Sequence, residues 1–219
     1  MKEYKDKKEF LREALRRLKL RYKGEMHSTL SFANSWELLV ATMLSAQSQD
    51  KQVNVVTSKL FKAYKTPYAF AKLRPAELYR YTRSLGLYRN KSKNIIKTAR
   101  IIAERFGGSV PSSIDGLTSL PGVGRKTANV VLYNGFGKNS GIAIDTHCIT
   151  VANRLGLVNT KSAVKIEDEL MQITKRDDWG DITHLFIALG RDVCRARDKR
   201  CAECVLNDIC PSSTLKAME

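Results

Sequence analysis

Apolar residues recur at three- and four-residue intervals along almost the whole chain, and this helical period constrains the fold more than any other feature. Residues 7–22 show it among Lys, Arg and Glu, with apolar positions at Phe10, Leu11, Ala14, Leu15 and Leu18. The same period predicts helices over 35–47, 48–64, 91–106, 146–157, 163–173 and 181–194, and a short helix within 111–120. Only residues 140–145, SGIAID, lean toward a β conformation. The pattern predicts an all-α protein.

Capping residues and breakers set the expected helix ends. Ser35 is the candidate N-cap of the apolar helix that follows it, and Pro67 and Pro75 each suit the first position of a short helix. Gly86 is expected to end the second of these short helices, and Gly107–Gly108 to close the helix over 91–106.

The charge balance points to a polyanionic partner. The chain has 38 Lys and Arg against 22 Asp and Glu, a net charge of +16. Such an excess favours nucleic acid, although a structural protein, a membrane-surface protein or a merely basic chain fits the composition too. The N-terminus is charged from its second residue, and no stretch approaches a membrane span. We therefore expect a cytoplasmic or nucleoid-associated protein that is not secreted and has no membrane partner.

Four of the five cysteines lie close together in the C-terminal tail, with C-x6-C-x2-C-x5-C spacing: Cys194, Cys201, Cys204 and Cys210. An intracellular setting disfavours disulfides, which leaves zinc or an iron–sulfur cluster. Only one C-x2-C pair is present, whereas zinc sites usually have two, so the spacing favours the cluster. The remaining Cys148 is interpreted as a small core residue.

The first two tail cysteines enclose four cations: Arg195, Arg197, Lys199 and Arg200. A loop held on a metal would present them as a fixed cationic ridge for DNA phosphates, and a solvated loop is the alternative.

The stretch SLPGVGRKTANVVL, residues 119–132, combines a tight glycine turn with the start of a helix. Glycines permit positive φ, and the amides of a helix N-terminus favour an anion such as a DNA phosphate. The spacing differs from that of a Walker loop, so a nucleoside triphosphate is not expected.

Lys126 falls in the first turn of that helix, where a cation is electrostatically unfavourable. The helix dipole and any desolvation favour the neutral amine that a nucleophile requires; a solvated lysine is the alternative. Asp145 is expected to cap the helix beginning at Thr146. If both helix ends met in one cleft, Asp145 could orient Lys126, accept its proton or stabilise a developing cation.

These motifs, in this order, resemble the endonuclease III branch of the helix–hairpin–helix DNA glycosylases. The resemblance rests on LPGVGRKTANVVL, on Asp145 in IDTH and on the cysteine tail, and it extends from about residue 35 to residue 210. The segment YNGFGKNSGIAID between the lysine and the aspartate is one residue longer than in the family pattern, within a glycine-rich loop.

The resemblance implies a fold of two helical lobes with the active site in the cleft between them. A six-helix barrel containing the helix–hairpin–helix would span 28–138, and a lobe with a [4Fe-4S] cluster would combine 1–27 with 139–219. It further implies excision of oxidised or ring-damaged pyrimidines from duplex DNA by a monomer that flips the damaged base, followed by cleavage of abasic sites.

Residue roles carry over by position. Lys126 would form a Schiff base with the sugar and nick the strand 3′ to the site by β-elimination, with Asp145 as its acidic partner. The four tail cysteines would hold the cluster. Gln47 would fill the space left by the flipped base and Leu87 would wedge the duplex. Further DNA contacts are expected from the glycine turn and its flank, Gly122, Val123, Gly124 and Arg125, and from the cationic ridge, while Lys91, Lys93, Lys97 and Arg100 are additional candidates.

Two alternatives remain at this point. Relatives that excise mispaired bases without nicking generally lack the lysine, so Lys126 argues against a mismatch-specific glycosylase. A non-catalytic DNA-binding module with a metal-stapled tail would require Lys126 and Asp145 to be coincidences.

Overall fold

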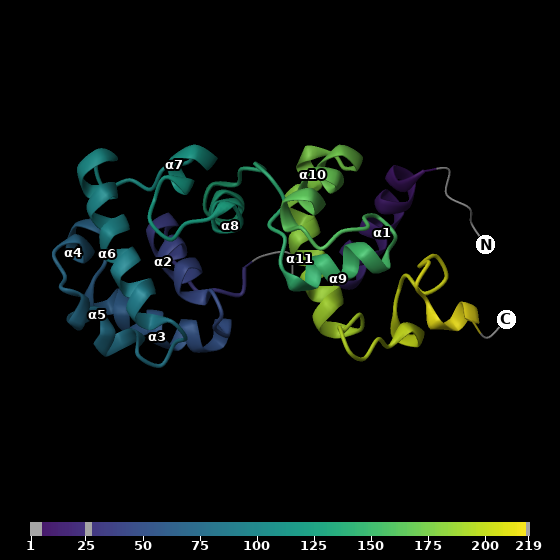
Figure 1. Cartoon of the computed structure of the whole chain (residues 1–219), viewed down its shortest axis with the longest axis horizontal. Helices are drawn as coiled ribbons and strands as arrows, with labels where there is room; N and C mark the ends of the chain where they lie inside the picture. The colour runs from purple at the N-terminus through teal and green to yellow at the C-terminus, as the bar shows by residue number, and fades with distance from the viewer. Residues whose placement is uncertain (1–5, 25–27, 218–219) are drawn as a thin grey trace. The chain divides into compact units, whose positions relative to one another are not determined.

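The computed structural model describes residues 6–24 and 28–217, and in these residues the regular structure is helical (Figure 1). The one β feature among them is an isolated bridge between Cys194 and Lys199. The prediction of an all-α protein is therefore confirmed. The segment 140–145, which leans toward β in sequence, is not a strand here, because side chains satisfy its amides. Ile142 N donates to Glu167 Oε1 at 3.2 Å, and Ala143 N donates to Thr183 Oγ1 at 3.0 Å.

The chain forms two compact units, which we name by their place in the sequence. The central unit is residues 28–138, and the flanking unit combines 6–24 with 139–217. The predicted boundary between residues 27 and 28 adjoins residues 25–27, which lie outside the described residues. None of the described helices is long and apolar enough to cross a bilayer.

The central unit consists of seven of the described helices: α2 (Ser35–Ser45), α3 (Asp50–Ala63), α4 (Pro67–Ala71), α5 (Pro75–Thr82), α6 (Tyr88–Arg105), α7 (Ile114–Thr118) and α8 (Arg125–Phe136). Helix α2 is buried from Leu38 to Leu44 and packs against α3, α6 and α8. A helix that is apolar on every side belongs inside a bundle, and α2 forms the centre of this unit's core.

Two expected helix ends in the central unit are wrong. Asn34, and not Ser35, caps α2, since its side chain accepts a hydrogen bond from Glu37 N at 3.0 Å. Helix α5 ends at Thr82, before Gly86. Pro67 and Pro75 do occupy the first turns of α4 and α5, and Gly107 and Gly108 follow α6 with positive φ, as predicted.

The flanking unit is built around α11 (Trp179–Asp192), which packs against α1 (Lys7–Arg21) and α9 (Thr146–Arg154). Helix α10 (Ala163–Ile173) contacts α1 and α9. All five predicted apolar positions of α1 are buried in the core of this unit. In Figure 1 the purple N-terminal helix lies among the green helices of the same unit.

Candidate active site

The glycine turn links α7 to α8, and the two helices pack together as a hairpin. Gly122 has φ 78°, and a Cβ at this position would lie 2.7 Å from Asn94 Nδ2, so both the backbone and the packing require glycine. Val123 N donates to Leu120 O at 3.1 Å, which closes the turn. The Val123 amide is thus engaged within the turn and the side chain is buried, and the phosphate contact expected of this amide stays a prediction.

Lys126 is the second residue of α8, behind the N-cap Gly124. Its side chain is exposed, as are Gly122, Gly124 and Arg125 beside it. The first turn of α8 contains no acidic residue that would neutralise the helix dipole or pair with the amine. The predicted position in the first helical turn is confirmed.

Asp145 caps α9 in the flanking unit, as predicted. Its Oδ1 accepts a hydrogen bond from Cys148 N at 2.8 Å, and the residue is half-buried. This contact fixes the orientation of the carboxylate at the start of α9. Cys148 itself is fully buried, with its sulfur 3.9 Å from Ala143 O and 3.8 Å from Thr183 O, which confirms its interpretation as a core residue.

Gln47 and Leu87 have left-handed backbones, with φ 54° and 56°, and they are the only non-glycine residues with positive φ in the described part of the chain. Leu87 is 58% exposed, so it is not a core leucine. A Cβ on the neighbouring Gly86 would lie 3.2 Å from Gln47 O, which places the two loops side by side. Strained residues of this kind concentrate at functional sites.

A buried lysine holds these two loops together. Lys91, on α6, donates from Nζ to Leu44 O at 2.7 Å and to Ser48 Oγ at 2.9 Å, and burial lowers its pKa. Gln52 Nε2 donates to Ser84 Oγ at 3.1 Å and adds a second tie. Lys91 was a candidate for DNA contact, and this expectation is wrong because its amine is used inside the protein. The helical period does distinguish it from the exposed Lys93 and Lys97, because Lys91 lies one turn before the buried Ile95 on the same face of the helix.

The four tail cysteines line one pocket, together with Arg154, Leu206 and other residues. All four are free thiols. Burial raises the pKa of Cys204 to about 11, and the other three thiols add to this shift, which shows that they lie near one another. In the described residues, however, no three Cys, His, Asp or Glu side chains are close enough as placed to ligate a metal ion. Four thiols around one pocket are nevertheless the donor set that suits zinc or an iron–sulfur cluster.

The cationic ridge divides into two kinds of residue. Arg195 and Arg197 are exposed, whereas Lys199 and Arg200 are half-buried. Lys199 Nζ donates to Ser212 O at 2.7 Å, and Arg200 contacts Asp192 O at 2.6 Å and Glu203 Oε2 at 2.9 Å. Lys199 and Arg200 therefore hold the loop closed on itself, and DNA contact by any of the four cations stays a prediction.

Arg154, at the end of α9, is a residue that the sequence reasoning missed. Its Nη1 donates to Cys194 O at 3.0 Å, to Cys194 Sγ at 3.4 Å and to Arg195 O at 2.8 Å, and its Nη2 donates to Ala196 O at 2.8 Å. Helix α9 is therefore capped by Asp145 at its start, and Arg154 at its end contacts Cys194, the first tail cysteine.

Comparison with known proteins assigns the family. Residues 40–176 match the HhH-GPD superfamily of base excision DNA repair proteins. Endonuclease III of Bacillus subtilis is 46% identical over 182 residues, which are 83% of each protein. This chain is an endonuclease III family member. It is accordingly a base excision repair DNA glycosylase of the class that also cleaves abasic sites.

Solved structures agree with the assignment. A trapped endonuclease III–DNA covalent intermediate superposes with a TM-score of 0.90 at 39% identity, covering 98% of this chain and 100% of that one. A thermostable thymine-DNA glycosylase has a TM-score of 0.82 at 18% identity, over 93% of this chain and 96% of that one, and this likeness shows a shared fold. Family membership sets aside the non-catalytic alternative.

Proposed function

We propose that this endonuclease III removes oxidised or ring-damaged pyrimidines from duplex DNA with Lys126 as its nucleophile. The observation that carries the proposal is the placement of an exposed amine in the first turn of α8, directly behind the glycine turn. The solved relative that was trapped as a covalent intermediate with DNA supports covalent chemistry for the family.

The proposed reaction begins when the electron pair of Lys126 Nζ attacks C1′ of the damaged nucleotide. The bond from C1′ to the base breaks, and the base leaves with the electron pair of that bond and takes up a proton. The amine loses a proton, and its electron pair forms the C1′=N bond as the C1′–O4′ bond breaks and O4′ takes up a proton, which gives an open-chain Schiff base. Loss of a C2′ proton then expels the 3′ phosphate, and the strand is nicked. Asp145 is the proposed acidic partner, and its cap contact with Cys148 keeps the carboxylate rigid.

The DNA contacts are proposed from the exposed residues alone. Gly122, Gly124 and Arg125 at the start of α8, with Arg195 and Arg197 on the tail loop, are the candidates for phosphates. Gln47 and Leu87 are the candidates for entering the duplex, since their adjacent loops present exposed, strained residues. The protein is proposed to act as a monomer where the DNA is, in the cytoplasm or nucleoid.

For the cofactor, we propose that Cys194, Cys201, Cys204 and Cys210 hold a [4Fe-4S] cluster in the flanking unit. The cluster would supply a cross-link among four points of the tail. Iron and inorganic sulfide in the purified protein would support this assignment, and zinc alone would contradict it.

Borohydride trapping tests the nucleophile. The wild type, Lys126→Gln and the charge-matched control Lys62→Gln, at an exposed position in the last turn of α3, are each incubated with a duplex containing one oxidised thymine. We expect a covalent adduct with the wild type and the control and none with Lys126→Gln. Base release without an adduct in the wild type would contradict the Schiff base. Release only from mispaired duplexes would contradict the substrate class.

A further inference from the structure

The segment between the last two tail cysteines, residues 204–210, lies against the N-terminal helix α1. Leu206 and Ile209 of this segment belong to the same buried cluster as the apolar face of α1. These contacts join parts of the chain that are almost 200 residues apart. The same segment also has polar contacts to α1, and those described here come from one side chain.

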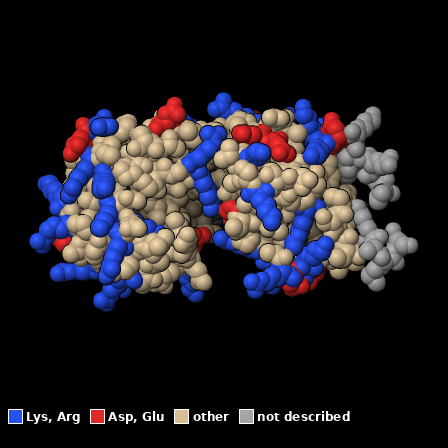
Figure 2. Space-filling model, in the orientation of Figure 1, with Lys and Arg blue, Asp and Glu red and all other residues tan. Residues whose placement is uncertain are grey.

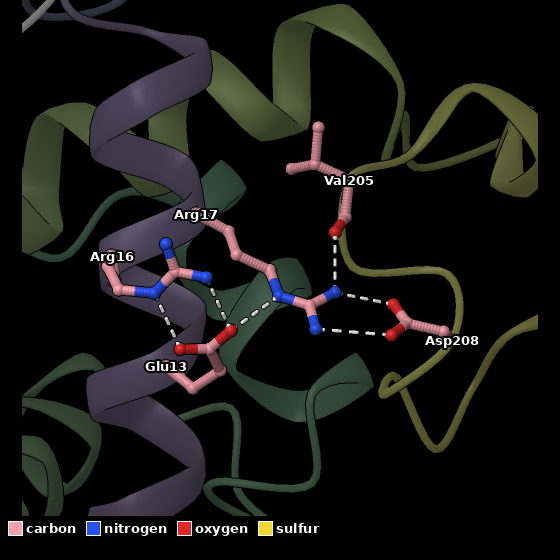
Figure 3. Close-up of polar contacts among 5 residues, drawn as sticks. All are labelled: Glu13, Arg16, Arg17, Val205 and Asp208. Carbon is pink, nitrogen blue, oxygen red and sulfur yellow. Dashed lines mark hydrogen bonds and ion pairs between the residues drawn. The ribbon is translucent and has the colours of Figure 1, made fainter. Parts of the chain in front are cut away.

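Arg17 makes those polar contacts. Its Nη1 donates to Val205 O at 3.1 Å and to Asp208 Oδ1 at 2.6 Å, and its Nη2 donates to Asp208 Oδ2 at 3.1 Å. On its own helix, Nε donates to Glu13 Oε1 at 2.8 Å. Figure 3 shows the guanidinium between Glu13 on one side and Val205 and Asp208 on the other. Four of its five N–H groups are thus used, in a planar fork that fixes its orientation.

The neighbouring Arg16 provides a comparison within the same helix. It also bonds Glu13, through Nε at 2.7 Å and Nη2 at 2.8 Å. Its side chain is 60% exposed, against 23% for Arg17. The two arginines therefore share Glu13 as a partner. They differ in that the contacts described for the Cys204–Cys210 segment come from Arg17. Isolated surface ion pairs contribute little to stability, but a bidentate pair within a network that also holds a backbone carbonyl is the exception.

From this geometry we infer that Arg17 is a positioning residue that anchors the Cys204–Cys210 segment to α1, and so holds the last two cysteines in place for the metal centre. The inference rests on the proposed cluster for its consequence and on the contacts of Arg17 for its mechanism. Val205 directly follows one proposed ligand, and Asp208 lies two residues before the other. A clamp at these two points limits how far Cys204 and Cys210 can separate.

Retention of the cluster is the first test. The holoprotein is diluted into an iron chelator, and loss of its visible absorbance and release of iron and sulfide are followed for the wild type, Arg17→Ala and Arg16→Ala. We expect Arg17→Ala to lose the cluster about fivefold faster than the wild type, the factor that roughly 1 kcal/mol corresponds to, while Arg16→Ala stays close to the wild type. Equal rates for the two variants would overturn the inference and show that Leu206 and Ile209 suffice as anchors.

Hydrogen exchange provides a second test that does not depend on the cluster. In Arg17→Ala, and in Asp208→Asn, we expect the amides of residues 204–210 to exchange about fivefold faster, with Arg16→Ala unchanged. When Arg17→Ala and Asp208→Asn are combined, their effects on the exchange rate should be less than additive, because both changes remove the same contact. Unchanged exchange in Arg17→Ala would overturn the anchor. A wild type without iron but with this exchange pattern would refute the proposed cofactor and leave the anchor standing.

Discussion

At the scale of single residues, the clearest feature is the strain at Gln47 and Leu87. A non-glycine residue in the left-handed region costs on the order of 1 kcal/mol or more. Leu87 gains little burial in return, because it is 58% exposed. The family resemblance identified both residues from the sequence. Their backbone conformation could not be predicted, because neither Gln nor Leu prefers positive φ, and the surrounding loops impose it.

Relief of this strain should separate stability from function. We expect Leu87→Gly to raise the free energy of unfolding by about 0.5–1 kcal/mol, because glycine adopts φ 56° without a steric penalty. The same change should slow base excision, since it removes the side chain proposed to enter the duplex. Leu87→Ala is the control: it keeps the strain, so its stability should match the wild type while its excision also slows. Urea unfolding and single-turnover excision measure the two effects, and a loss of stability in Leu87→Gly would contradict this account.

Asp145 combines a structural contact with a proposed chemical one, and two substitutions can distinguish them. Asn caps helices as well as Asp, so Asp145→Asn should retain stability, whereas Asp145→Ala should lose about 1 kcal/mol with the contact to Cys148 N. Excision should fall in both variants, because both remove the carboxylate. Full activity in Asp145→Asn would restrict this residue to capping.

At the scale of helices, the sequence period predicted where most helices lie but not all of their ends. Asn34 and Ser35 are both good caps. Asn34 caps the helix because its side chain accepts from Glu37 N, and the Glu37 side chain in turn accepts from Ala33 N, one residue before the cap. Helix α5 ends at Thr82 although Gly86 is the nearest breaker. Gly86 is instead needed for the close approach to Gln47 O, a tertiary contact that local patterns do not report.

The contact between α1 and the tail should depend on pH through Glu13. Hydrogen bonds from Arg16 and Arg17 lower the pKa of Glu13 from 4.5 to about 2. A carboxyl group with a lowered folded-state pKa contributes stability that is fully present above its unfolded pKa and is lost as pH falls through the folded value. The difference in unfolding free energy between the wild type and Arg17→Ala should thus be constant above about pH 4.5 and shrink between pH 4.5 and pH 2. Urea titrations at several pH values test this, and a difference that grows on acidification would contradict it.

At the scale of the whole molecule, the net charge is +16, and Lys and Arg side chains are scattered over both units on the face drawn in Figure 2. The sequence predicted a polyanionic partner correctly in kind, since the family repairs DNA. The sequence could not show which of these cations are available to contact DNA. Lys91, Lys199 and Arg200 are used inside the protein, and their contacts appear only when distant segments are brought together. Arg17 and Arg154 were missed for the same reason. The tail residues that Arg17 contacts lie at least 188 residues away, and those that Arg154 contacts lie at least 40 residues away.

Salt dependence of DNA binding should distinguish the two kinds of cation. Each phosphate contact adds about 0.9 to the slope of log affinity against log salt concentration. We expect Arg197→Gln to reduce that slope by about 0.9, because Arg197 is exposed on the tail loop. Lys199→Gln should leave the slope unchanged, because its amine is bonded to Ser212 O. Equal slopes for Arg197→Gln and the wild type would remove Arg197 from the DNA interface.

The flanking unit combines a sequence segment before the central unit with one after it, and this division determines the order in which the protein can form during synthesis. Helix α1 leaves the ribosome first, yet α11 and the cysteine segment that pack on it lie beyond residue 139. At ribosomal speed, the roughly 155 residues between α1 and α11 take on the order of 10 s, enough for the central unit to fold alone. The apolar face of α1 stays uncovered throughout that interval. The nascent chain therefore presents a bare amphipathic helix to chaperones, and the proposed metal centre can form only after Cys210 has emerged.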